Sequence, residues 1–136
     1  MNNKTFWIGY IAAFAAFEAQ AYLVHSVLLT DTYESLAAVL RPEEEMFDIM
    51  WQMMLGQAAY LLLFCYIFTR GREGGGIAEG VRYGVLMGLF LGIPLAVEQY
   101  VIFPIPGDLA AIWFATTLVF LVVCGALFAA IYRPSS

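Results

Sequence analysis

Hydrophobic residues fill four long stretches of the 136-residue chain, and short polar segments separate them. The stretches cover residues 6–29, 46–69, 77–103 and 109–132. Each has at least the ~20 residues that a helix needs to cross the ~30 Å hydrocarbon core of a bilayer. Only helices satisfy their own backbone groups within one such segment. The pattern therefore predicts an all-α, integral membrane four-helix bundle that forms a single transmembrane domain over residues 1–136, with a short interfacial helix near 32–40.

Composition and charge placement agree with a membrane protein and predict its orientation. Hydrophobic residues make up 62% of the chain and charged residues 12%, far above and far below the averages of soluble domains. Five cations lie near the N-terminus, the second connection or the C-terminus, namely Lys4, Arg70, Arg72, Arg82 and Arg133. The positive-inside rule then places both termini and the loop at 70–76 in the cytoplasm. The opposite end is acidic and the net charge is −5, which argues against nucleic acid as a partner.

Glycine recurs at every fourth position of the third stretch, at Gly80, Gly84, Gly88 and Gly92. This spacing puts the four residues, called here the glycine stripe, on one face of a helix. An interior glycine costs a helix roughly 1 kcal/mol relative to Ala, but in lipid a small-residue stripe lets two helix backbones approach closely. The stripe is therefore predicted to pack against another helix of this chain or a second copy. The first stretch, which is rich in Ala, is its natural partner.

Polar side chains inside the predicted spans form a candidate ion or proton site. Glu18, Tyr22 and His25 stand at i, i+4 and i+7, so they share one face of the first helix. Glu18 falls near the bilayer midplane, where an ionisable residue is functional by default. Gln57 of the second stretch can reach the same depth, and Glu98 lies toward the outer end of the third. The alternative is a neutral Glu18, hydrogen-bonded inside the bundle.

The sequence offers little to catalysis or cofactor chemistry. Four methionines of the second stretch and His25 are donor types that bind Cu(I), but their spacing is more typical of packing, so no metal site is predicted. The loop at 70–76 lacks the Lys-Ser/Thr ending of a phosphate-binding loop. No motif combines a nucleophile, a base and an orienting group. We therefore expect neither an enzyme nor a bound cofactor.

Three segments carry a resemblance to known proteins: residues 66–84, the Pro-Ile-Pro turn at 104–106 and the ending at 131–134. In these segments the chain resembles a group of small four-span bacterial inner-membrane proteins of unknown function. The resemblance extends over most of the chain from Arg41 onward. It implies a multi-pass protein of the bacterial cytoplasmic (inner) membrane and supplies no activity or site residue. Small multidrug-resistance transporters share the four short spans and a glutamate in the first span, and the likeness ends there.

Three functions fit these features. The first is a non-catalytic small membrane subunit or interaction protein that packs through its glycine-stripe helix, either as a homo-oligomer or docked on a larger membrane complex. The second is a small proton- or cation-coupled transporter or channel oligomer that uses Glu18. The third is a haem- or pigment-binding subunit with His25 as an axial ligand. The glycine stripe and the scarcity of chemistry in the cytoplasmic half favour the first.

Overall fold

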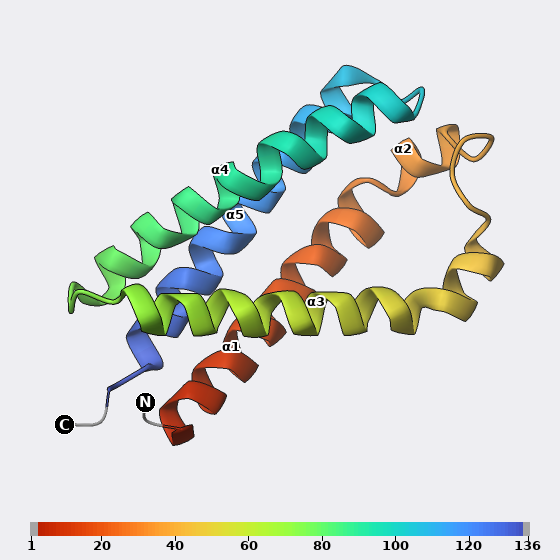
Figure 1. The fold of residues 1–136 in the computed structure, drawn as a ribbon. Coiled ribbons are helices and arrows are strands. Elements are labelled where there is room, and N and C mark those ends of the chain that lie inside the picture. Colours follow the sequence, from red (N-terminus) through yellow and green to blue (C-terminus); the bar gives the residue numbers. More distant parts are fainter. Residues whose placement is uncertain (1–2, 135–136) are drawn as a thin grey trace.

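The computed structural model describes residues 3–134, which form helices joined by short connections (Figure 1). The elements are α1 (Asn3–Ala21) with its π-helical continuation η1 (Tyr22–Leu28), α2 (Thr30–Ser35), α3 (Glu43–Gly71), α4 (Gly76–Ile102) and α5 (Gly107–Ile131). The helix formed by α1 and η1, together with α3, α4 and α5, gives four helices long and apolar enough to cross a membrane. The predicted all-α architecture with four apolar helices is thus confirmed. The segment expected to be interfacial holds α2, followed by turns at 36–39.

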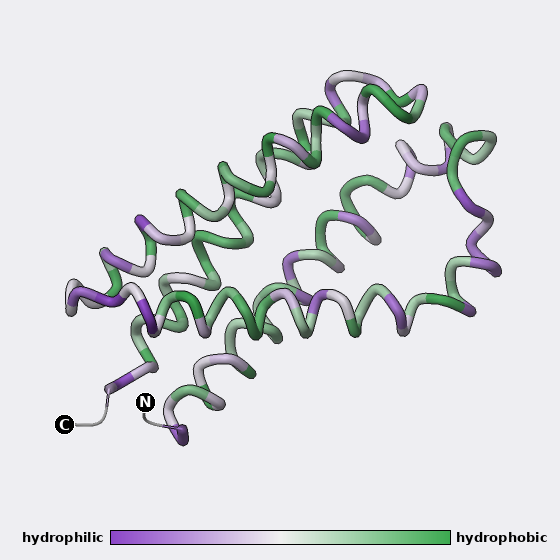
Figure 2. Tube along the Cα trace, in the orientation of Figure 1, coloured by the Kyte–Doolittle hydropathy of each residue, from purple (hydrophilic) through white to green (hydrophobic). Residues whose placement is uncertain are grey.

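The two ends of the molecule hold different parts of the chain. The two termini and the α3–α4 loop lie at one end, and α2 and the α4–α5 connection lie at the other (Figure 1). At the first end the Thr5 hydroxyl donates to the Arg133 carbonyl at 3.0 Å, and the Arg72 guanidinium lies 5.9 Å from the Tyr132 ring centroid. We call this the basic end, since it carries five of the six Lys and Arg residues. The other is the acidic end, and Figure 2 shows hydrophilic residues where α3 begins there.

Helices α4 and α5 form a tight antiparallel hairpin in which the glycine stripe faces α5. All four stripe glycines are buried. A Cβ built on Gly84 would lie 2.6 Å from Val122 Cα, and one built on Gly88 would lie 2.9 Å from Leu118 Cα. A Cβ built on Gly80 would meet the Gly125 carbonyl oxygen. Because not even a Cβ atom fits at these points, the backbones of α4 and α5 are in direct contact along the stripe.

The expectation that the first span is the partner of the glycine stripe is corrected by this arrangement. Helix α1 packs on α5 instead, where Gly9 lies against the Phe128 ring and Ala13 is fully buried. The Ala13 carbonyl accepts a hydrogen bond from Cys124 Sγ at 3.3 Å. The short connection at 103–106 makes α4 and α5 neighbours, and Gly125 gives α5 a small residue opposite the stripe. Helix α5 is therefore the central helix, with α4 and α1 packed on it.

The largest core cluster lies at the basic end and joins three helices. Its fully buried members are Ala13 of α1 and residues from the second halves of α3 and α5, including Leu61, Phe64, Cys65, Leu121, Cys124 and Phe128. The Phe128 ring makes edge contacts with Phe6 of α1 and Phe68 of α3, at centroid distances of 5.7 Å each. A smaller cluster between η1 and α5, with Val24 and Leu109 among its members, occupies the acidic end.

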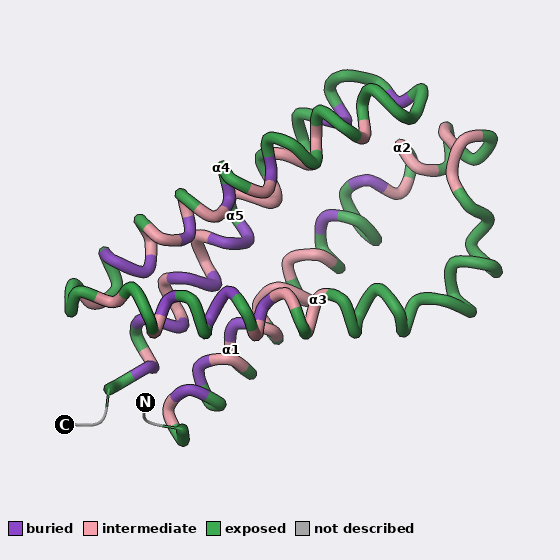
Figure 3. Tube along the Cα trace, in the orientation of Figure 1, coloured by how far each residue is buried: buried purple, intermediate pink, exposed green. Residues whose placement is uncertain are grey.

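Helix α3 belongs to this core only through its second half. Leu61, Phe64, Cys65 and Phe68 are buried there, whereas every residue from 43 to 56 is exposed. Figures 1 and 3 show α3 crossing α1 and then running away from it toward the acidic end. The four long helices therefore pack together at the basic end. The first half of α3 (residues 43–56) is not buried against any of the other long helices.

Candidate functional site

A polar cluster at the acidic end joins η1, α2 and α5 through His25, Tyr33 and Trp113. The Trp113 indole N–H donates to the Tyr33 hydroxyl oxygen at 3.0 Å. Tyr33 Oη also lies 2.6 Å from His25 Nδ1, and the two rings stack at an interplanar angle of 8°. Since an indole N–H only donates, the Tyr33 O–H is free to donate to Nδ1. That arrangement requires the His25 tautomer with Nδ1 unprotonated, so Nε2 carries the proton and acts only as a donor.

The π-helical segment η1 redirects the residues that the sequence places on one helix face. A π-helix closes i→i+5 hydrogen bonds, so each turn holds more residues than an α-turn, and the Leu29 N–H accordingly donates to the Val24 carbonyl at 2.9 Å. Tyr22 is 67% exposed, whereas His25 turns toward Tyr33. Glu98 is an exposed residue of α4. The structure therefore pairs His25 with Tyr33, in place of Tyr22 or Glu18.

Glu18 and Gln57 each contain a buried side-chain oxygen without a hydrogen-bond partner. Glu18 Oε1 and Gln57 Oε1 have no partner among the described residues. Each residue is next in sequence to one that joins α1 to α3, where the Tyr10 hydroxyl donates to the Ala58 carbonyl at 3.0 Å and the Phe17 and Tyr60 ring centroids are 6.5 Å apart. Glu18 directly follows Phe17, and Gln57 directly precedes Ala58. We call Glu18 and Gln57 the orphan pair.

A carboxylate clamp organises the α3–α4 loop at the basic end. Glu79 is 7% exposed, and its Oε2 accepts hydrogen bonds from the backbone N–H groups of Gly75 at 2.7 Å and Gly74 at 3.1 Å. Its Oε1 accepts from the Glu73 N–H. Gly74 has a φ of 94°, a left-handed conformation that favours glycine. The side chain of Glu79 thus satisfies three consecutive loop donors and fixes the entry into α4.

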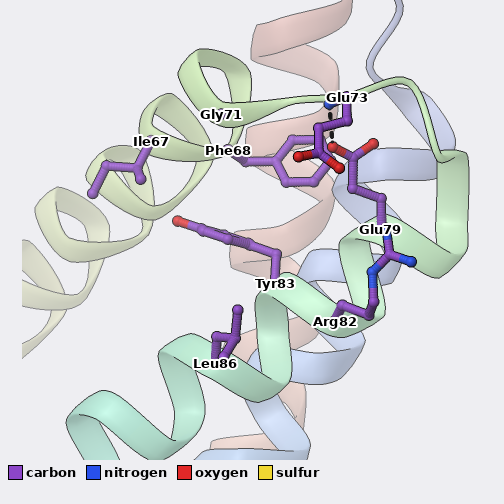
Figure 4. Close-up of a pocket in the computed structure, with 8 residues that line it drawn as sticks. All are labelled: Ile67, Phe68, Gly71, Glu73, Glu79, Arg82, Tyr83 and Leu86. Atoms are coloured by element: carbon purple, nitrogen blue, oxygen red, sulfur yellow. Dashed lines mark hydrogen bonds between the residues drawn. The ribbon is translucent and has the colours of Figure 1, made fainter.

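A cavity of about 210 Å³ opens beside this clamp, between the end of α3 and the start of α4 (Figure 4). Its lining is Ile67, Phe68, Gly71, Glu73, Glu79, Arg82, Tyr83 and Leu86. The Tyr83 hydroxyl donates to the Phe64 carbonyl at 2.7 Å, which closes the inner side of the cavity. Arg82 makes no ion pair with any residue that the structure describes. A cavity with apolar walls and one unpaired cation therefore lies at the basic end.

Metal-binding groups do not gather in residues 3–134, where no three His, Cys, Asp or Glu side chains come together as a possible metal site. The methionines of α3 that share a face, Met46, Met50, Met53 and Met54, are all exposed. In the tautomer that accepts from Tyr33 at Nδ1, the proton sits on Nε2, so neither ring nitrogen of His25 offers a lone pair for an axial ligand role.

Sequence reasoning missed Tyr33, Trp113, Glu79 and Arg82 as members of these sites. For Glu79 a signal was present, because three glycines followed by a glutamate in the first turn of a helix favour a carboxylate that bonds back to loop N–H groups. For Tyr33 and Trp113 the sequence gives no such signal, since they are 80 residues apart and meet only in the fold.

The fold and these sites define a small helical protein with four helices able to cross a membrane. Comparison of the chain with protein-family models, with curated proteins and with solved structures finds no match.

Replacing Tyr33 with Phe is expected to weaken the packing of α2 on η1 and α5. The hydroxyl accepts from Trp113 and bonds His25, so its loss should lower the free energy of unfolding by about 1–2 kcal/mol. Unfolding in detergent micelles measures this, and Tyr22→Phe is the matched control, since Tyr22 is 67% exposed.

The same variant tests a pH dependence. Burial, partly offset by the Trp113 hydrogen bond, raises the pKa of Tyr33 above its ordinary value of 10.0. The unfolded chain then ionises first, so the contribution of Tyr33 is fully present below pH 10 and is lost as the pH rises through the folded pKa. The stability difference between wild type and Tyr33→Phe should shrink above pH 10, and a difference that stays constant to pH 11 would contradict the assignment.

Proposed function

We propose that the chain is a non-catalytic membrane interaction protein that receives a helix of a partner along the first half of α3, next to the orphan pair. The observation that carries this proposal is the pair of buried oxygens, Glu18 Oε1 and Gln57 Oε1, that have no donor among the described residues. Buried polar groups in proteins are nearly always hydrogen-bonded. In the hydrocarbon core each unsatisfied group costs several kcal/mol, so a donor would stabilise both. Each oxygen is inaccessible while its residue is half-buried, so a donor on a partner helix requires the side chain to rotate outward on docking.

The exposure of α3 supports a partner at this place. Residues 43–56 are exposed on all faces, and they include Gln52 and Asp48 besides apolar residues. Lipid alone offers no hydrogen bonds to such side chains, whereas Ser, Thr, Asn, Gln or His on a neighbouring helix does. The glycine stripe is already covered by α5. Docking in this proposal therefore uses α1 and α3, and the stripe holds the scaffold together.

The charge at the acidic end favours a partner that is basic there. Glu43, Glu44 and Glu45 begin α3, Asp48 follows one turn later, and the described residues contain a single ion pair, Arg41 with Glu45 at 3.1 Å. A second copy in the same orientation would bring these carboxylates together, and such like-charge contacts are costly. A helix of a larger membrane protein with Lys or Arg at this level would complement them. In this proposal the chain is a multi-pass subunit of a bacterial inner membrane, with both termini in the cytoplasm.

A small proton- or cation-coupled transporter is the second candidate, and the same Glu18 oxygen favours it. An acidic side chain inside a span, with a lone pair that no protein donor uses, can bind a proton or a cation. The two candidates differ in what the carboxylate must do. A docking residue needs a hydrogen-bonding group of similar shape, whereas a proton carrier needs a group that ionises.

Substitutions in the orphan pair test the proposal. Gln57→Leu and Glu18→Leu are expected to weaken retention of the partner roughly three- to twentyfold, because an interhelical hydrogen bond in lipid contributes about 0.6–1.7 kcal/mol. The mass of the complex purified in mild detergent measures this. Gln20→Leu is the matched control, because its amide already donates to the Ala16 carbonyl of its own helix.

Glu18→Gln separates the two candidates. A docking role predicts that this variant keeps the partner, since the amide has the same shape and can still hydrogen-bond. Transport predicts instead that reconstituted wild-type protein carries a proton or cation flux and that Glu18→Gln abolishes it. If the Leu variants leave the mass of the complex unchanged, docking at the orphan pair is wrong.

A further inference from the structure

The cavity at the basic end combines the two features that an anionic lipid requires, an apolar wall and a cation. Ile67 and Leu86 line it and are 47% and 66% exposed, so they present apolar surface outward from α3 and α4. Phe68 and Tyr83 close its inner side, and Arg82 lies near the loop (Figure 4). Its volume of about 210 Å³ is several times the ~30 Å³ that one water occupies.

The charges around the cavity leave Arg82 as the available cation. Glu79 spends its two carboxylate oxygens on three loop N–H groups. Arg70 and Arg72 do not line the cavity. The Arg72 guanidinium lies over the Tyr132 ring with its buried Nε unpartnered among the described residues, and the Arg70 guanidinium lies 6.0 Å from the Tyr66 ring centroid. Arg82 has no ion-pair partner in the described chain. A guanidinium can donate two parallel hydrogen bonds to one phosphate. Its planar geometry therefore fits a phosphate group better than a Lys ammonium does.

We infer that this cavity binds the phosphate group of an anionic phospholipid, with Arg82 on the phosphate and an acyl chain along Ile67 and Leu86. The cavity lies where two predicted spans end, at the level of lipid headgroups, and basic pockets between helices at that level suit anionic headgroups. The outward-facing apolar wall favours a lipid over free phosphate. Glu73 and Glu79 also line the cavity, and both carboxylates oppose the phosphate, so they limit the affinity.

Native mass spectrometry of the full chain in mild detergent tests the inference with dioctanoyl phosphatidylglycerol as the probe. Phosphatidylglycerol should be retained and dioctanoyl phosphatidylcholine should not. Arg82→Gln is expected to weaken phosphatidylglycerol binding roughly tenfold, the effect of one charge-assisted hydrogen-bonded contact. Glu73→Gln should strengthen it. Arg133→Gln is the matched control, since it removes one positive charge at the same end outside the cavity lining, and it should leave binding unchanged.

A conservative variant and a competition experiment complete the test. Arg82→Lys keeps the charge without the planar fork, so it should fall between wild type and Arg82→Gln, and a thermal scan shows whether each variant is folded. Inorganic phosphate and glycerol phosphate compete only for Arg82, so neither should displace the lipid at equal concentration. Equal losses in Arg82→Gln and Arg133→Gln, full binding by Arg82→Gln, or displacement by inorganic phosphate at the concentration of the lipid would each overturn the lipid site.

Discussion

Gly84→Leu is expected to disrupt the α4–α5 hairpin and to cost about 3 kcal/mol or more of unfolding free energy. A Cβ at this position alone would meet the Leu121 carbonyl oxygen and lie 2.6 Å from Val122 Cα. Those atoms belong to the backbone of α5, so they cannot move aside as a flexible side chain does. Overpacking a well-packed interior typically costs 1–3 kcal/mol, occasionally more, and a leucine here forces two helices apart.

Gly56→Leu is the matched control for this prediction. Gly56 lies inside α3, and a Cβ built there meets nothing within 4 Å. Leucine forms helices better than glycine by several tenths of a kcal/mol or more, so this variant should be as stable as wild type or slightly more stable. Unfolding of both variants in mixed micelles, followed by circular dichroism, gives the comparison. If Gly84→Leu has the same free energy of unfolding as wild type, the close backbone contact between α4 and α5 is contradicted.

Glu79→Ala is expected to have the second largest effect, a loss of about 2–4 kcal/mol. The substitution leaves three loop N–H groups without their acceptor, and each orphaned donor costs about 1–3 kcal/mol when water cannot reach it. The loop residues at 73–75 are exposed, so water recovers part of that loss. Loss of the clamp should also free the loop, which rapid hydrogen exchange of the Gly74 and Gly75 amides would report.

Two further variants serve as comparisons for Glu79→Ala. Glu79→Gln keeps one acceptor oxygen, so its loss should be about half that of Glu79→Ala. Glu73→Ala is the control, because the Glu73 side chain is exposed and contributes to the clamp only through its backbone N–H, so a change within about 0.5 kcal/mol is expected. Equal stability of Glu73→Ala and Glu79→Ala would contradict the clamp.

The four apolar helices could be predicted from the sequence because the hydropathy pattern is local and lipid permits few alternatives. The partner of the glycine stripe could not, since small residues line both α1 and α5. The connection at 103–106 and the position of Gly125 decide in favour of α5. Nor does hydropathy reveal that residues 43–56 of α3 lie away from the other helices, because an exposed and a buried span have similar composition in a membrane protein.

The candidate polar site was predicted only as a set of residues, and its geometry depends on two features that a sequence pattern does not encode. The change from α- to π-helix at Tyr22 redirects His25 toward Tyr33. The packing of α1 on α3, with Tyr10 bonded to Ala58, leaves one buried oxygen each on Glu18 and Gln57 without a partner among the described residues. Glu79 was the residue within reach of sequence reasoning, from the glycines that precede it.

The measurement that tests the central claim most directly is the mass of the native chain purified from its own membrane in mild detergent. The proposed docking function predicts a discrete complex heavier than the 15.1 kDa chain, with a second membrane protein as a stoichiometric component. Gln57→Leu should shift that peak toward the free chain, and Gln20→Leu should not. A peak that contains only this chain and detergent, with or without the substitutions, would contradict a partner helix at α3.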